Sequence, residues 1–105
     1  MLSPRGILRG FDADGHAGAD EVGRNIACAA ATSLLRTAGK LCAERALVKA
    51  GGASAPGEMR LVLQAAANAD DGWLKGMTDF LLRGLKDLAQ EFPREIVVRT
   101  ETTEV

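Results

Sequence analysis

The only histidine of the chain, His16, precedes one of its two cysteines, Cys28, by twelve positions. A thiol has a pKa of about 8.5 and attacks carbonyl groups as the thiolate, so a catalytic cysteine needs a partner that takes its proton. A histidine within hydrogen-bonding reach is such a partner, because it removes the proton and later returns it to the leaving amine. The two residue types predict acyl-transfer chemistry, with Cys28 as nucleophile and His16 as general base, provided that the fold brings them together.

Two predicted elements and the loop between them must position this pair. Residues 7–14 predict a short strand with apolar anchors at Ile7 and Phe11. Residues 15–24 hold three glycines and two acidic residues, a composition typical of a loop. At about 3.3 Å per extended residue, this loop is long enough to fold back and bring the two candidate residues together.

A helix is predicted just after Asn25, because apolar and small residues recur there at spacings of three and four. Asn25 is a favourable N-cap residue, and the helix is expected to end between Thr37 and Glu44. Cys28 would then lie in the first turn, where unpaired amides and the helix dipole favour a thiolate and can hold an oxyanion. Asn25 is thus a candidate for capping the helix, for orienting the imidazole, or for both.

The whole chain, residues 1–105, predicts a single α+β domain with two helices packed on one small mixed or antiparallel β-sheet. Periodicity and turn residues divide the second half into a strand or helix tail at 46–50, a turn at 51–57, a strand at 58–64, a helix at 68–92 that Pro93 stops, and a final strand at 95–100. The apolar stripes of these elements are interpreted as core packing.

Composition narrows the functional classes. The net charge of −1 and the 4 % aromatic content argue against direct nucleic-acid binding, and no apolar run is long enough to span a membrane. The start of the chain is too short and polar for a secretory signal, so a cytoplasmic protein with reduced cysteines is expected. One histidine and two distant cysteines do not make a zinc site, and no metal or other cofactor is expected.

Cys42 follows Cys28 by fourteen residues, which is about 21 Å along a continuous helix. A disulfide needs Cα atoms closer than about 7 Å, so an internal bridge is excluded if the helix is intact. Cys42 is therefore interpreted as a packing residue. On the residues alone, the same interpretation is open for Cys28, because a cysteine in an alanine-rich helix is commonly a small buried hydrophobe. His16, which follows a glycine, is equally open to being a turn residue.

Two motifs carry a resemblance to a known family. Gly15-His16-Ala is followed, after a glycine-containing loop, by Asn25-Ile-Ala-Cys28-Ala-Ala, and residues 82–93 read Leu-Arg-Gly-Leu-Lys-Asp-Leu-Ala-Gln-Glu-Phe-Pro. Over nearly the whole chain this pattern resembles the ribosomal-processing cysteine protease family, Prp. The resemblance implies a small homodimeric α+β protein that removes a short N-terminal extension from a large-subunit ribosomal protein, cutting after an aromatic residue. It also implies the roles of His16 as general base and Cys28 as nucleophile.

The chain departs from the family pattern at three places. Asn25 stands where the family has an aspartate. An amide can hold an imidazole but does not stabilise imidazolium as a carboxylate does, so we expect lower activity or help from Asp20 or Glu21. Thr32 replaces a family serine and keeps the hydroxyl. Family members carry a full strand before the one predicted at 7–14, and we expect that edge strand to be truncated or missing here.

Two other functions compete with the protease. The first is a catalytically weak or silent module that binds the same ribosomal protein, which the asparagine at position 25 and the short N-terminus would favour. The second is a thiol peroxidase or redox sensor that uses Cys28. That chemistry needs a resolving thiol nearby, and the predicted helix places Cys42 out of reach within one chain.

Overall fold

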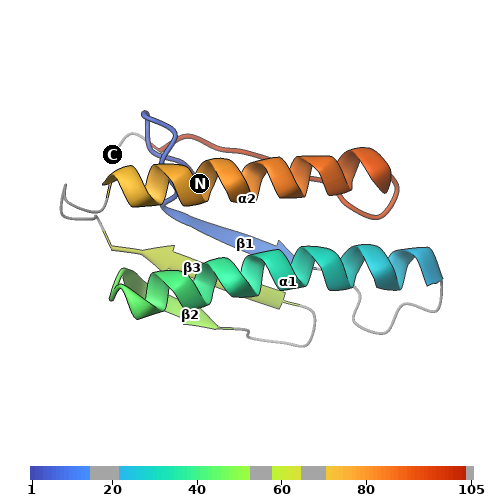
Figure 1. Ribbon diagram of the computed structural model, residues 1–105, viewed down its shortest axis with the longest axis horizontal. Helices are drawn as coiled ribbons and strands as arrows, with labels where there is room; N and C mark the ends of the chain where they lie inside the picture. Colours follow the sequence, from blue (N-terminus) through green and yellow to red (C-terminus); the bar gives the residue numbers. More distant parts are fainter. Residues whose placement is uncertain (15–21, 53–57, 65–70, 104–105) are drawn as a thin grey trace.

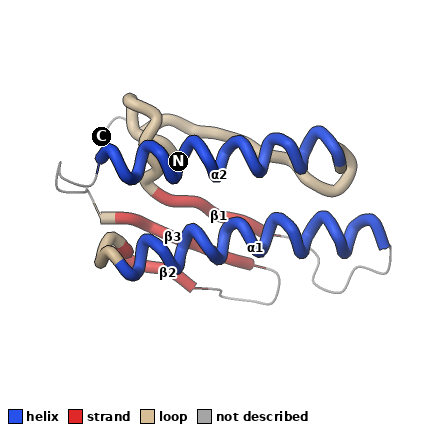
Figure 2. Tube along the Cα trace, viewed as in Figure 1, coloured by secondary structure: helices blue, strands red, loops and turns tan. Residues whose placement is uncertain are grey.

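The structure is a computed structural model that describes residues 1–14, 22–52, 58–64 and 71–103. Its elements are β1 (Gly10–Asp14), α1 (Val22–Glu44), β2 (Val48–Gly52), β3 (Glu58–Leu63) and α2 (Asp71–Glu91). The strands form an antiparallel sheet in the order β1-β3-β2, and the helices lie side by side over one face of it (Figure 1 and Figure 2). The predicted α+β architecture is confirmed, with an antiparallel sheet. Neither described helix is long and apolar enough to cross a bilayer.

The two helices run in opposite directions (Figure 1). Just after α1, the Arg45 guanidinium lies 4.3 Å from the centre of the Trp73 ring, near the start of α2. Toward the other end, Gly84 approaches Leu34 so closely that a Cβ at this glycine would come within 3.0 Å of the Leu34 Cδ1 atom. The helices are thus in contact at two levels. The first is a cation–π contact, which contributes about 0.5–1 kcal/mol at an exposed site. The second is the close approach that the missing side chain of Gly84 allows.

The sheet is apolar on the face beneath the helices and charged on the other face. Along β1 and β3, Phe11 pairs with Leu61 on the inner face, whereas Asp12 pairs with Arg60 on the outer face. The alternation of apolar and charged residues, already visible in the sequence, therefore orients both strands. The inner face and the helices share one core, whose buried members include Leu8, Leu35, Cys42, Leu63, Leu74 and Leu81.

One buried hydroxyl ties the chain before β1 to α2. Thr78 is fully buried, and its Oγ1 accepts a hydrogen bond from the Leu8 N–H at 2.9 Å and donates one to the Leu74 carbonyl at 2.6 Å. The strand predicted at 7–14 is observed as β1 from Gly10 to Asp14, and just before it the Arg9 carbonyl accepts a hydrogen bond from the Leu63 N–H of β3 at 2.8 Å. The strand predicted at 58–64 is confirmed as β3.

The boundaries of α1 differ from the prediction. The helix begins at Val22, so Asn25 is its fourth residue and not its N-cap, and Cys28 is its seventh residue. It ends at Glu44, and Ala46 then adopts a left-handed φ of 57° that turns the chain out of the helix. The strand β2 follows, so of the two structures predicted for residues 46–50, a strand or a helix tail, the strand is confirmed.

The final strand predicted at 95–100 is wrong. After α2 ends and the chain turns at Pro93, residues 96–100 lie outside any ladder of the described residues, and a single parallel bridge joins Thr102 to Leu2. A β-rich composition describes side chains that suit a sheet, but a strand also needs a neighbour along its length. Leu2 offers that neighbour at one position only.

We expect Thr78→Val to lower the free energy of unfolding by about 1–3 kcal/mol, because it leaves the buried Leu8 N–H without an acceptor while keeping the side-chain shape. Thr37→Val, on the exposed side of α1, is the matched control and should change stability by less than about 0.5 kcal/mol. Urea unfolding followed by circular dichroism measures both. Equal effects of the two substitutions would show that the hydrogen bond between Leu8 and the Thr78 hydroxyl does not stabilise the fold.

Candidate active site

Cys28 lies on the side of α1 that faces the core. Residues seven positions apart in a helix are about two turns apart and share a face. Leu35 and Cys42 follow Cys28 at one and two such steps, and they are 8 % and 0 % exposed. Cys28, about 10 Å nearer the helix start than Leu35, is only half-buried. Cys28 thus lies on the same side of α1 as the buried Leu35 and Cys42, but nearer the start of the helix, where the core covers it only in part.

Cys28 lies beyond the first turn of α1. With the helix beginning at Val22, the unpaired amides belong to residues 22–25, and the Cys28 N–H falls within the regular helical ladder. The influence of the helix dipole falls off within the first turn. The expectation that Cys28 lies in the first turn is therefore wrong, because it is the seventh residue of the helix. The role of the helix-start amides as oxyanion donors stays a prediction.

The strand β1 leads toward the predicted base. It ends at Asp14, two residues before His16, and lies in the sheet layer beneath the helices. His16 itself belongs to the segment 15–21, outside the described residues. Also outside them are the side chain of Asn25 and the two alternative acids, Asp20 and Glu21. The structure therefore describes the strand before His16 and the helix that carries Cys28, and the roles of these residues stay predictions.

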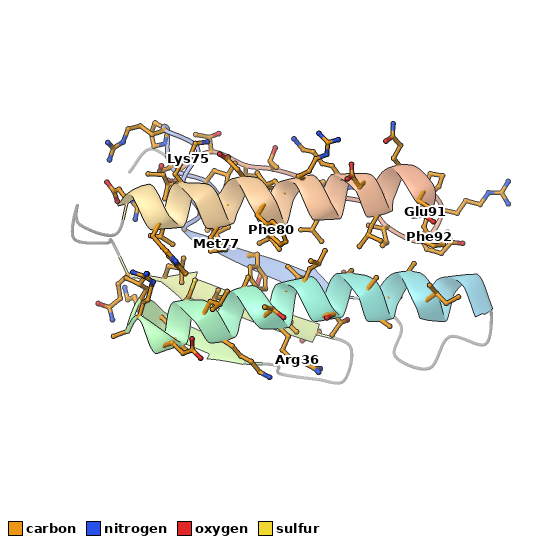
Figure 3. All side chains as sticks on the ribbon, viewed as in Figure 1. Arg36, Lys75, Met77, Phe80, Glu91 and Phe92 are labelled. Atoms are coloured by element: carbon orange, nitrogen blue, oxygen red, sulfur yellow. The ribbon has the colours of Figure 1, made fainter. Side chains whose placement is uncertain are left out.

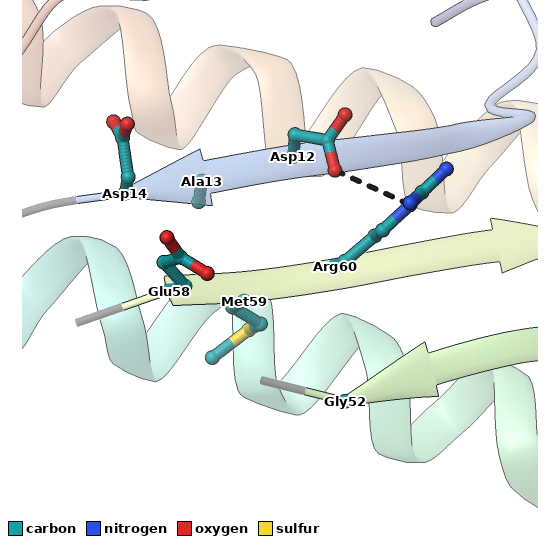
Figure 4. A pocket seen from close by; sticks show the side chains of 7 residues that line it. All are labelled: Asp12, Ala13, Asp14, Gly52, Glu58, Met59 and Arg60. Atoms are coloured by element: carbon teal, nitrogen blue, oxygen red, sulfur yellow. Dashed lines mark ion pairs between the residues drawn. The ribbon is translucent and has the colours of Figure 1, made fainter. Parts of the chain in front are cut away.

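A pocket of about 350 Å³ lies at the end of the sheet from which the chain continues to His16 (Figure 4). Asp12 pairs there with Arg60 at 3.5 Å, and Asp14 stands opposite Glu58 in the ladder. The Asp12–Arg60 pair is largely exposed and contributes little stability. This pocket was not predicted. Its signal in the sequence is two charged residues at alternate positions in each strand, 12 and 14 in β1 and 58 and 60 in β3, which become a cluster only once the register is known.

The two cysteines have different environments. Cys42 is completely buried, and burial raises the pKa of its thiol, so it stays protonated at neutral pH. Cys28 is half-buried, and neither cysteine forms a disulfide. The predictions of unbridged cysteines and of Cys42 as a packing residue are confirmed.

Residues 2–97 match the family model described as cysteine protease Prp. The chain belongs to this family. Its fold is similar over 97 % of its length to SMU.848 from Streptococcus mutans, with 25 % identity, a TM-score of 0.79 and 90 % of that chain covered. It is also similar over 97 % to the essential ribosomal processing protease Prp from S. aureus in complex with a substrate peptide, with 16 % identity, a TM-score of 0.68 and 93 % of that chain covered. A search of curated proteins gave no significant match. The Prp resemblance inferred from the two motifs is thus confirmed.

In the folded Prp-family protein, we expect iodoacetamide to label Cys28 and to leave Cys42 unmodified, because burial shields Cys42 and raises its pKa. Intact mass and peptide mapping should find one label in buffer and two in urea. Cys28→Ala should abolish the native label, and Cys42→Ala should retain it. Labelling of both thiols at similar rates in buffer would contradict these two environments.

Proposed function

We propose that this protein is a cysteine endopeptidase that removes a short N-terminal extension from a large-subunit ribosomal protein in the cytoplasm. The observation that carries the proposal is the match to the cysteine protease family Prp over residues 2–97, a range that includes the half-buried, unbridged Cys28. The S. aureus protein of the same fold is a ribosomal processing protease in complex with a substrate peptide, which supports the substrate class. The chemistry needs only side chains and water.

In the proposed mechanism, His16 removes the proton from the Cys28 thiol, and the thiolate attacks the scissile carbonyl of an extended peptide. The imidazolium then protonates the departing amine, and a water molecule deprotonated by the same imidazole hydrolyses the acyl-enzyme. Asn25 precedes Cys28 by three residues, so both occupy neighbouring positions of one helix face, from which the amide would orient the imidazole.

Incubation with an N-terminally extended large-subunit ribosomal protein of the same organism, read by intact mass, tests this proposal. We expect one cut near the N-terminus of that protein, slowed at least about 10³-fold in Cys28→Ala, because loss of a nucleophile removes the covalent route. Cys42→Ala, the same change in the core, should keep the cleavage if the variant is folded. His16→Ala should be nearly inactive at pH 7 and partly recover above pH 8.5, where a thiol ionises without help.

Cleavage at an unchanged rate in Cys28→Ala would refute the proposed nucleophile. If the folded parent protein binds the ribosomal protein and does not cut it, the chain is instead the binding module that competes with the protease. In that case Asn25→Asp, which restores the carboxylate of the family pattern, shows whether one substitution accounts for the missing activity.

The homodimer implied by the resemblance is also part of the proposal, and one surface of the helical layer supports it. Phe80 is 71 % exposed, and Met77, one turn earlier in α2, carries the apolar surface toward α1 (Figure 3). Leu41, 39 % exposed, lies four residues before Arg45, and Met77 lies four after Trp73, so the two residues lie at the same level of the antiparallel helices. A contiguous exposed apolar patch of this kind is typical of an interaction site.

We expect Phe80→Ser to convert the dimer into a monomer in sedimentation velocity, with little change in Tm, because the exposed ring adds little to the stability of one subunit. Val97→Ser removes an equally exposed apolar side chain (74 %) outside the patch and should leave the dimer intact. A parent protein that sediments as a monomer at micromolar concentration would contradict the homodimer.

A further inference from the structure

The helix α2 contacts both of the elements that lead to the candidate catalytic residues. Thr78 accepts the hydrogen bond from the Leu8 N–H at 2.9 Å, at the entry to β1, the strand that leads to the candidate base. Gly84 lies against Leu34 of α1, the helix that carries the candidate nucleophile. Thr78 and Gly84 are about 9 Å apart along α2 and about 120° apart around it, so one is directed to the sheet and the other to α1. The separation of the two candidates therefore depends on how α2 holds β1 and α1.

The part of α1 that carries Cys28 extends past the described strands. Cys28 is the seventh of the 23 residues of α1, and the beginning of this helix lies beyond the ends of β1 and β3 (Figure 1). Of the described helices and strands, α2 is the one that runs beside it there. Ala27, the residue before Cys28, is fully buried and lies two turns before Leu34 on the same side of α1. The side of α1 that faces α2 is thus covered up to the residue next to the candidate nucleophile.

Gly84 allows α1 to approach α2 closely because it has no side chain. A Cβ at this position would lie 3.0 Å from the Leu34 Cδ1 atom, 3.7 Å from Cδ2 and 3.9 Å from Cγ. The whole branched end of the leucine therefore lies over the glycine. Carbon atoms in contact are ordinarily about 3.5–4.0 Å apart, so a methyl group at Gly84 has to displace Leu34. Because Leu34 packs against the core, we expect the backbone of α1 to take up part of the displacement.

A second glycine of the same helix lacks this contact. A Cβ at Gly76 would meet no atom of another part of the molecule within 4 Å. Glycine in the interior of a helix is less favourable than alanine, and this cost applies to Gly76 and Gly84 alike. Only at Gly84 does the missing side chain also make room for a residue of α1. The two glycines are therefore a matched pair, which separates the effect of helix propensity from the effect of helix separation.

We propose that Gly84 is a positioning residue for the proposed cleavage. Because it has no side chain, it sets the separation of α1 and α2, and with it the place of Cys28 relative to the end of β1, two residues before His16. Proton transfer from a thiol to an imidazole requires the two groups to be within hydrogen-bonding distance, so a small shift of α1 slows it. Gly84 acts through Leu34 and the backbone of α1, and not on the reacting atoms. The inference rests on the proposed protease function and names a residue that controls its geometry.

The first test compares Gly84→Ala and Gly76→Ala with the parent protein in cleavage of the N-terminally extended ribosomal protein. Gly84→Ala should lower kcat about 3–10-fold and leave KM within twofold, since a misplacement of about 1 Å costs about 100-fold and the shift here is smaller. Gly76→Ala should change both parameters less than twofold. Both variants should melt at or above the Tm of the parent, because alanine favours a helix more than glycine does.

The rate at which iodoacetamide labels Cys28 reports the same geometry without a substrate. At pH 7 a thiol needs a base to take its proton, whereas at pH 9 it ionises without help. Gly84→Ala should therefore lower the labelling rate at pH 7 at least threefold and change the rate at pH 9 less than 1.5-fold. Gly76→Ala should leave both rates within 1.5-fold of the parent. A loss that is equal at the two pH values would show a general structural effect and would overturn the positioning role.

Leu34→Val tests whether the effect passes through the leucine. The valine side chain ends near the present Cγ position, 3.9 Å from the methyl group that Gly84→Ala adds, which is an ordinary contact distance. Adding Leu34→Val to Gly84→Ala should restore kcat and the labelling rate at pH 7 to within twofold of the parent. A loss that this second substitution does not restore, or equal behaviour of the two alanine variants, would contradict the proposal.

The positioning role and the protease function can fail separately. If the parent protein cuts the ribosomal protein and Gly84→Ala is as active as Gly76→Ala, the protease stands and the role of Gly84 is refuted. If the parent cuts nothing, yet Gly84→Ala slows labelling at pH 7 and Leu34→Val restores it, the role of Gly84 in placing Cys28 stands and the protease fails.

Discussion

A threonine hydroxyl inside the core connects the helical layer to the sheet. Leu8 needs an acceptor for its buried N–H, and α2 supplies it through Thr78, whose own hydroxyl proton goes to the Leu74 carbonyl. An unsatisfied buried donor costs about 1–3 kcal/mol, so this contact fixes the level at which β1 enters the sheet beneath α2. The level at which β1 ends, and therefore where the chain continues to His16, follows from it.

The parts of the fold that could be predicted are those that local periodicity determines. Alternation between residues 58 and 63 and the long apolar stripe of α2 each bury one face, so they predict a strand and a helix whatever lies around them. Cys42 could be interpreted as a packing residue because a continuous helix places it too far from Cys28 for a disulfide. The candidate pair His16 and Cys28 could be proposed from residue types, spacing and the Prp motif.

The parts that were missed depend on neighbours that the sequence does not reveal. The early start of α1 at Val22 places helix where glycines and charges predict a loop. The β-rich residues 95–100 form no ladder within the described part of the chain, where Leu2 bridges Thr102 instead. The charged pocket at the end of the sheet needs the register that sets Asp14 opposite Glu58. In each case the deciding contact is distant along the chain.

The bridge between Leu2 and Thr102 joins residues a hundred positions apart, almost the two ends of the chain. During synthesis this contact forms only after Thr102 has emerged from the ribosome, whereas β1, β3 and the helices lie earlier in the chain and can already be paired. The bridge between Leu2 and Thr102 is therefore the last of the described strand contacts to form. A nascent chain that has exposed only the residues up to Glu91 can pack both helices on the sheet but still lacks the partner of Leu2, so the chain that leads into β1 gains this contact only from residues beyond α2.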